Sequence, residues 1–112
     1  MCFFKKNTKP AEKNQEDRDI IEVASGLVGT LIVQAEGEEE LVEKLKALQE
    51  KVKYMTPSTD AKILGYDKKI QNKITDFKVV MLKKSGTERV KAVDEFIRDV
   101  YMLVEERNAY WK

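Results

Sequence analysis

The chain has 112 residues, of which 42% are hydrophobic and 37% charged, a composition typical of one globular domain and unlike that of a disordered protein. It contains one cysteine and no histidine, which excludes a disulfide framework within the chain, the common zinc sites and the nucleophiles that depend on histidine. The formal net charge of +1 argues against a dedicated polyanion binder. We therefore expect no catalytic residue, no cofactor, no metal site and no enzymatic activity.

Residues 1–16 show no sustained hydrophobic period and predict a flexible basic leader, followed by a single domain at residues 17–112. The opening MCFFKK combines two phenylalanines with two lysines, so weak contact of residues 1–6 with an anionic membrane is an alternative use of this leader. We favour a leader without membrane contact, because a single such signal anchors a protein weakly. No secretory signal is recognisable, and we expect a cytoplasmic protein.

The first predicted helix covers residues 18–36 and includes a run from Val23 to Ala35 without any charge. This run is too short for a membrane span, which needs about 20 residues. A β-strand is the other alternative, but Leu31, Ile32 and Val33 are consecutive and break the alternation of a strand. The apolar residues recur instead at steps of three and four, which is the period of one helix face: Ile20, Ile21, Ala24, Leu27, Val28, Leu31, Ile32 and Ala35.

Capping residues give the expected ends of the first two helices. Asp17 and Asp19 lie where a cap or first-turn acid belongs, and Gly37 is a plausible end. The second helix, predicted at residues 38–54, starts with three glutamates, which the helix dipole favours at that position. Its apolar stripe consists of Leu41, Leu45, Leu48 and Val52.

The third helix is predicted at residues 57–84, with Thr56 as the cap and Pro57 in the first turn. Because Gly65 weakens a helix, a later start with Asp67 as the cap is the alternative. Ser85 and Gly86 form the next turn, and Thr87 is the cap candidate of a fourth helix at residues 87–110. The two apolar stripes are Ile63, Ile70, Ile74, Phe77 and Met81, and then Val90, Val93, Ile97, Val100, Val104 and Trp111.

Four amphipathic helices joined by short loops predict an all-α fold, namely a four-helix up-and-down bundle made of two antiparallel helical hairpins. Two helices carry small or apolar residues outside their main stripe. In the fourth helix these are Phe96, Leu103 and Tyr110, and in the first they are Gly26, Gly29 and Val33. The functional interpretation is a surface for a partner, and the alternative is that these second faces pack inside the same core.

The charges are unevenly distributed. Residues 15–50 hold three basic and ten acidic side chains, a net charge of −7, whereas residues 51–91 hold eleven and four, a net charge of +7. On the third helix, Lys62, Lys69 and Lys73 follow one flank and are candidates for contacts with a polyanion. The favoured alternative is that this flank is solvated or pairs with the acidic segment, because the chain is nearly neutral overall.

These observations predict a small non-catalytic helical protein that acts through protein–protein interaction, in an adaptor or accessory role. The expected partner is another protein or a second copy of the chain in a homodimer. The alternative function is that of a nucleic-acid-associated accessory protein that uses the basic flank of the third helix.

Overall fold

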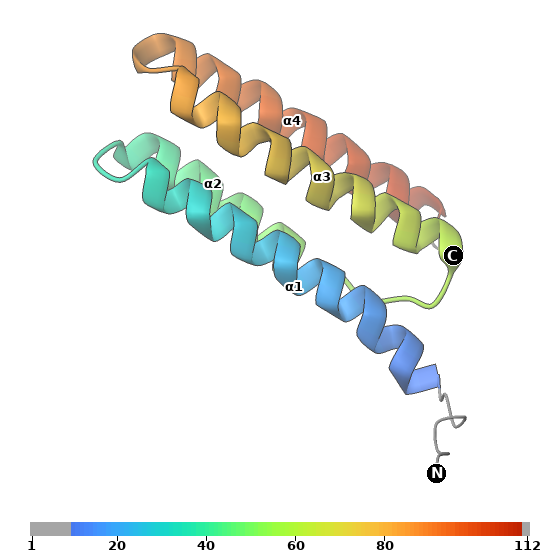
Figure 1. Cartoon of the computed structure of the whole chain (residues 1–112). Coiled ribbons are helices and arrows are strands. Elements are labelled where there is room, and N and C mark those ends of the chain that lie inside the picture. The colour runs from blue at the N-terminus through green and yellow to red at the C-terminus, as the bar shows by residue number, and fades with distance from the viewer. Residues whose placement is uncertain (1–9, 111–112) are drawn as a thin grey trace.

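The computed structural model describes residues 10–110, and all regular structure in that range is α-helical (Figure 1). The four helices are α1 (Pro10–Gln34), α2 (Glu39–Lys53), α3 (Ala61–Lys83) and α4 (Gly86–Tyr110). The prediction of an all-α four-helix bundle is confirmed, and residues 23–34 are helical rather than a strand. Residues 1–9, most of the predicted leader, lie outside the described residues, as does Trp111.

The helices form two antiparallel hairpins, α1 with α2 and α3 with α4, which lie against each other (Figure 1). Helix α1 contacts α2 and α3, and α4 contacts α3 and α2. Helices α1 and α3 run in the same direction, since α1 and α3 both start at the end of the bundle where the connection 54–60 lies. This end of the bundle therefore brings together the early part of α1, the start of α3, the end of α4 and the connection.

All four helix starts differ from the predicted ones, by one residue in α2 and α4 and by more in α1 and α3. Helix α1 begins at Pro10 and not at residue 18, because a proline is tolerated in a first turn, where backbone N–H groups have no partner inside the helix. Asp17 is consequently an interior residue of α1 and not its cap. Helix α3 begins at Ala61 with Asp60 as the cap, whose carboxylate accepts a hydrogen bond of 2.8 Å from the Lys62 N–H. Neither Thr56 nor Asp67 caps this helix.

The two turns within the hairpins depend on glycine. Gly37 has φ of +96° and Gly86 has φ of +62°, a region that residues with a side chain rarely adopt. Both turns stand where the sequence predicts them. Arg89 connects the two turns through hydrogen bonds. It donates to Met81 O at 2.7 Å and to Lys84 O at 2.9 Å near the second turn, and to Glu38 Oε2 at 2.8 Å beside the first. This arginine satisfies carbonyl groups that the end of α3 leaves without partners inside the helix.

The core consists of one apolar stripe from each helix. The predicted stripes of α2 and α3 are buried as expected. In α4, Val93, Val100 and Val104 are buried as predicted, but Phe96 is buried in place of Ile97, which is only half-buried. The Phe96 ring stacks on Phe77 of α3 with 4.1 Å between ring centroids and 6° between planes. The buried apolar residues of α1 and α4 are Ile21, Ala24, Val28, Leu31 and Ala35, with Val93, Phe96, Val100 and Val104.

Three charged residues continue these stripes at the end of the bundle where the connection 54–60 lies. Asp17 precedes Ile21 by four positions in α1, Asp67 lies between Ile63 and Ile70 in α3, and Arg107 follows Val104 in α4. All three are buried. A charged side chain is rarely buried unless it has a partner, so each of these residues is expected to have one.

Candidate functional site

The three residues of α4 proposed as a partner surface do not form one surface. Phe96 is only 4% exposed and belongs to the core, because its ring stacks on Phe77. Leu103 is half-buried and packs against the same core. Tyr110 is exposed, and the Lys62 ammonium lies 5.4 Å from the centre of its ring. The alternative of packing inside the core thus holds for Phe96, and the prediction of a partner surface there is wrong.

The residues of α1 separate into two groups. A side chain at Gly29 would meet Gln49 Nε2 of α2 at 3.1 Å, and Gln49 also donates to Ser25 O at 3.1 Å. Gly29 therefore serves the packing of α1 on α2 and is not available to a partner. Gly26 has nothing within 4 Å of the position of a side chain, and Val33 is 69% exposed. These two residues lie on the outer surface of α1.

Exposed apolar side chains are present on both α1 and α3. Val23, Val33, Val79 and Leu82 are four of the large hydrophobic residues that are exposed in the described part of the chain. At about 100° per residue, Val23 lies on the side of α1 away from Gly29, and thus toward α3. Leu82 lies about 180° around α3 from Lys73, which pairs with Asp99 of α4 at 3.5 Å, so Leu82 is on the side toward α1. Val33 lies about 40° around α1 from Gly29 and about 80° from Val23, so it belongs to the outer side of α1 and not to the side toward α3. We define the α1/α3 face as Val23, Gly26, Thr30 and Val33 on the outer side of α1, with Val79 and Leu82 on α3.

The basic flank of α3 is only partly assembled. Lys62 and Lys69, with Gly65 and Tyr66, line a shallow depression of about 290 Å³. The Lys69 ammonium lies 5.6 Å from the centre of the Tyr66 ring. Lys73, the third predicted residue, instead forms its ion pair with Asp99. Two of the three lysines therefore share a site, and the third pairs with a carboxylate of α4 at the surface.

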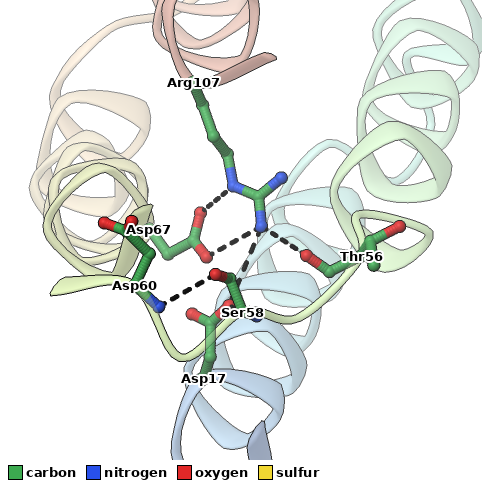
Figure 2. Close-up of polar contacts among 6 residues, drawn as sticks. All are labelled: Asp17, Thr56, Ser58, Asp60, Asp67 and Arg107. Carbon is green, nitrogen blue, oxygen red and sulfur yellow. Dashed lines mark hydrogen bonds and ion pairs between the residues drawn. The ribbon is translucent and has the colours of Figure 1, made fainter. Parts of the chain in front are cut away.

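Buried polar contacts surround Arg107, as Figure 2 shows. The Arg107 Nε donates to Asp67 Oδ1 at 2.6 Å, and its Nη2 donates to Asp67 Oδ2 at 3.2 Å and to Thr56 O at 2.6 Å. The same Nη2 lies 3.7 Å from Asp17 Oδ2, which accepts a hydrogen bond of 2.8 Å from the Ser58 N–H. We call Asp17, Asp67 and Arg107 the aspartate–arginine cluster.

The cluster contains two carboxyl groups and one guanidinium group in a dry environment. Asp17, Asp67 and Arg107 are 0%, 1% and 2% exposed, and Asp17 Oδ1 has no hydrogen-bond partner. Burial and the neighbouring Asp17 carboxyl raise the pKa of Asp67 to about 7, although Arg107 opposes the increase. A depression of about 370 Å³ adjoins Arg107 between α2 and α4, and Lys51, Tyr54, Thr56 and Asn108 are among its lining residues.

Sequence reasoning missed this cluster, although the helical period contained a signal for it. The buried positions of α3 alternate at steps of four and three through Ile63, Asp67 and Ile70. An interrupted stripe of this kind indicates a charged residue at a core position. Its partner, Arg107, is 40 residues away in the sequence, and no local pattern connects the two.

Comparisons of the chain with protein-family models, with curated proteins and with solved structures gave no match. Within residues 10–110, none of the helices combines the length and the apolar character needed to cross a membrane. The same residues contain no group of three or more cysteine, histidine, aspartate or glutamate side chains placed to hold a metal ion.

Proposed function

We propose that this protein is a small non-catalytic accessory protein that binds another protein, or a second copy of itself, through the α1/α3 face. The observation that carries the proposal is the lack of charge on the outer side of α1 between Val23 and Val33, in a chain with 37% charged residues. An outer helix face of this kind has no structural need to be uncharged, since it does not contribute to the core.

The second support is the extension of this surface onto a neighbouring helix. Leu82 is 74% exposed on the side of α3 toward α1. Side chains from two adjacent helices give a broader contact than a single helix, and Gly26 allows a partner backbone to approach α1 closely. Exposed apolar side chains that gather in this way are typical of protein-binding surfaces.

The test compares the double variant Val33→Glu/Leu82→Glu with the control variant Met102→Glu. Met102 is a comparably exposed hydrophobic residue on α4, which is not in contact with α1. We expect the wild-type protein and the control to show the same solution mass and to capture the same proteins, and the double variant to lose the dimer or the captured protein. Unchanged mass and unchanged capture by a folded double variant would refute the proposal.

A second candidate function, association with nucleic acid, is favoured by the depression that Lys62, Tyr66 and Lys69 share. Two ammonium groups beside an aromatic ring suit a phosphate and an unpaired base. This function predicts binding of single-stranded RNA or DNA that weakens steeply with salt and is lost in Lys62→Glu/Lys69→Glu. No binding at low ionic strength would dismiss it.

A further inference from the structure

The aspartate–arginine cluster connects every segment at one end of the bundle. Asp17 belongs to α1, Asp67 to α3 and Arg107 to α4 (Figure 2). Two hydrogen bonds attach the connection 54–60 to this cluster, one from Arg107 Nη2 to Thr56 O and one from the Ser58 N–H to Asp17 Oδ2. The position of the connection thus depends on the state of three buried ionisable groups.

The charges of the cluster do not balance when both of its carboxyl groups are ionised. With both carboxyl groups ionised, the cluster would carry a net charge of −1 in a place where its members are at most 2% exposed. Two carboxylates that share one site do not both ionise readily, because each disfavours the charged form of the other. Other charged groups lie nearby on α2, where Glu50 and Lys51 line the depression beside Arg107, and at the start of α3, where Asp60 caps the helix.

We propose that the aspartate–arginine cluster is a proton-controlled latch for residues 54–60. With a proton on Asp67, the cluster is neutral and the connection stays closed on the bundle. When that proton passes to water, the cluster carries an uncompensated buried charge, and opening of the connection hydrates both carboxylates. The depression beside Arg107 gives water a short path to the cluster.

The direction of the pH dependence follows from the preference of the closed form for the proton. Asp67 has a pKa of about 7 in the closed form, and hydration in the open form returns the pKa toward its ordinary value of 3.8. The closed form is therefore favoured at acidic pH. The opening equilibrium constant rises between about pH 4 and about pH 7, by up to about tenfold per pH unit, and levels off at higher pH.

The test is hydrogen exchange of the amides of residues 54–60 at pH 5.5 and at pH 7.5, with rates corrected for the intrinsic effect of pH. For the wild-type protein we expect the opening constant to rise about tenfold or more between these two values. Asp67→Asn removes the carboxyl group that holds the proton, so this variant should change by less than about twofold. The control Asp99→Asn removes an exposed carboxylate of α4 and should keep the wild-type increase.

A wild-type protein whose corrected opening constant changes by less than about twofold would overturn the proposal, as would an Asp67→Asn variant that keeps the wild-type increase. If Asp67→Asn does not fold, the two measurements on the wild-type protein decide: the hydrogen exchange above and the NMR titration that follows. A second measurement needs no variant: carbon-13 NMR of the wild-type protein should show the Asp67 carboxyl group titrating near pH 7. Titration of Asp67 in the ordinary acidic range would equally overturn the proposal.

Discussion

Replacement of Arg107 by methionine is the perturbation for which the structure makes the sharpest prediction. Methionine keeps an unbranched apolar chain of similar length but removes the guanidinium group. The change removes the two hydrogen bonds to Asp67, at 2.6 and 3.2 Å, and the one to Thr56 O, at 2.6 Å. It also leaves two buried carboxyl groups without a cation.

The expected loss follows from the burial of the group. Removing one partner of a buried ion pair typically lowers the free energy of unfolding by about 3–5 kcal/mol, because the other charge is left uncompensated. A domain of this size has a total stability of about 5–15 kcal/mol, so Arg107→Met should remove a large part of it. At about 4 °C per kcal/mol, the melting temperature should fall by about 12–20 °C.

The assay is urea unfolding followed by circular dichroism, at pH 5 and at pH 7.5. Because Arg107 lowers the pKa of Asp67, its removal raises that pKa further, and the loss of stability should be larger at pH 7.5 than at pH 5. A matched variant, Asp17→Leu/Asp67→Leu/Arg107→Met, replaces the whole cluster by apolar groups and should be nearly as stable as the wild type or more stable. A loss below about 1 kcal/mol in Arg107→Met, or an equal loss at both pH values, would refute the reasoning.

Three further predictions concern other positions. Asp67→Asn should flatten the pH dependence of the free energy of unfolding. In the wild type, the pKa of Asp67 is about 7 in the folded protein and 3.8 in the unfolded chain, so protonation of Asp67 stabilises the fold. This stabilisation is present in full below about pH 4, and up to about 4 kcal/mol of it is lost as the pH rises to about 7. Unfolding curves across this pH range measure the difference, and equal slopes for both proteins would contradict it. Phe96→Ala should lower the free energy of unfolding by about 3–5 kcal/mol, because the Phe96 ring is buried against Phe77. The control Met102→Ala changes an exposed side chain and should lower it by less than about 0.5 kcal/mol. A similarly small loss for Phe96→Ala would place the ring outside the core. Gly26→Ala should stabilise the protein by about 0.5–1 kcal/mol in thermal unfolding, since the position is open and alanine favours a helix. Gly37→Ala should destabilise the protein by about 1 kcal/mol, because φ of Gly37 is +96°. A change of stability in the same direction for Gly26→Ala and Gly37→Ala would contradict this prediction.

The fold was largely predictable because each helix carries its own periodic signal. In α3, the spacing of Ile63, Ile70 and Ile74 identifies the buried side without any knowledge of the neighbouring helices. The turns at Gly37 and Gly86 were equally predictable, since few residues other than glycine adopt a positive φ. Helix starts were less predictable, because several residues near the start of α3 are acceptable caps and only the folded structure selects Asp60.

The candidate sites were less predictable because they depend on contacts between helices. Phe96 and Ile97 are adjacent apolar residues about 100° apart, and the choice between them is made by the stacking of Phe96 on Phe77. The burial of Asp67 likewise depends on Arg107, which lies in another helix. The sequence pattern of a single helix does not indicate the contact of Phe96 with Phe77 or that of Asp67 with Arg107.

Crosslinking at a single position tests the proposed binding surface most directly. A photoreactive benzoylphenylalanine placed at Val33, and separately at Met102 as the control, reports which exposed side is covered by another chain in living cells. We expect a crosslinked species from position 33 and none from position 102. A crosslink from position 102 alone, equal crosslinks from both positions, or no crosslink from position 33 would contradict it.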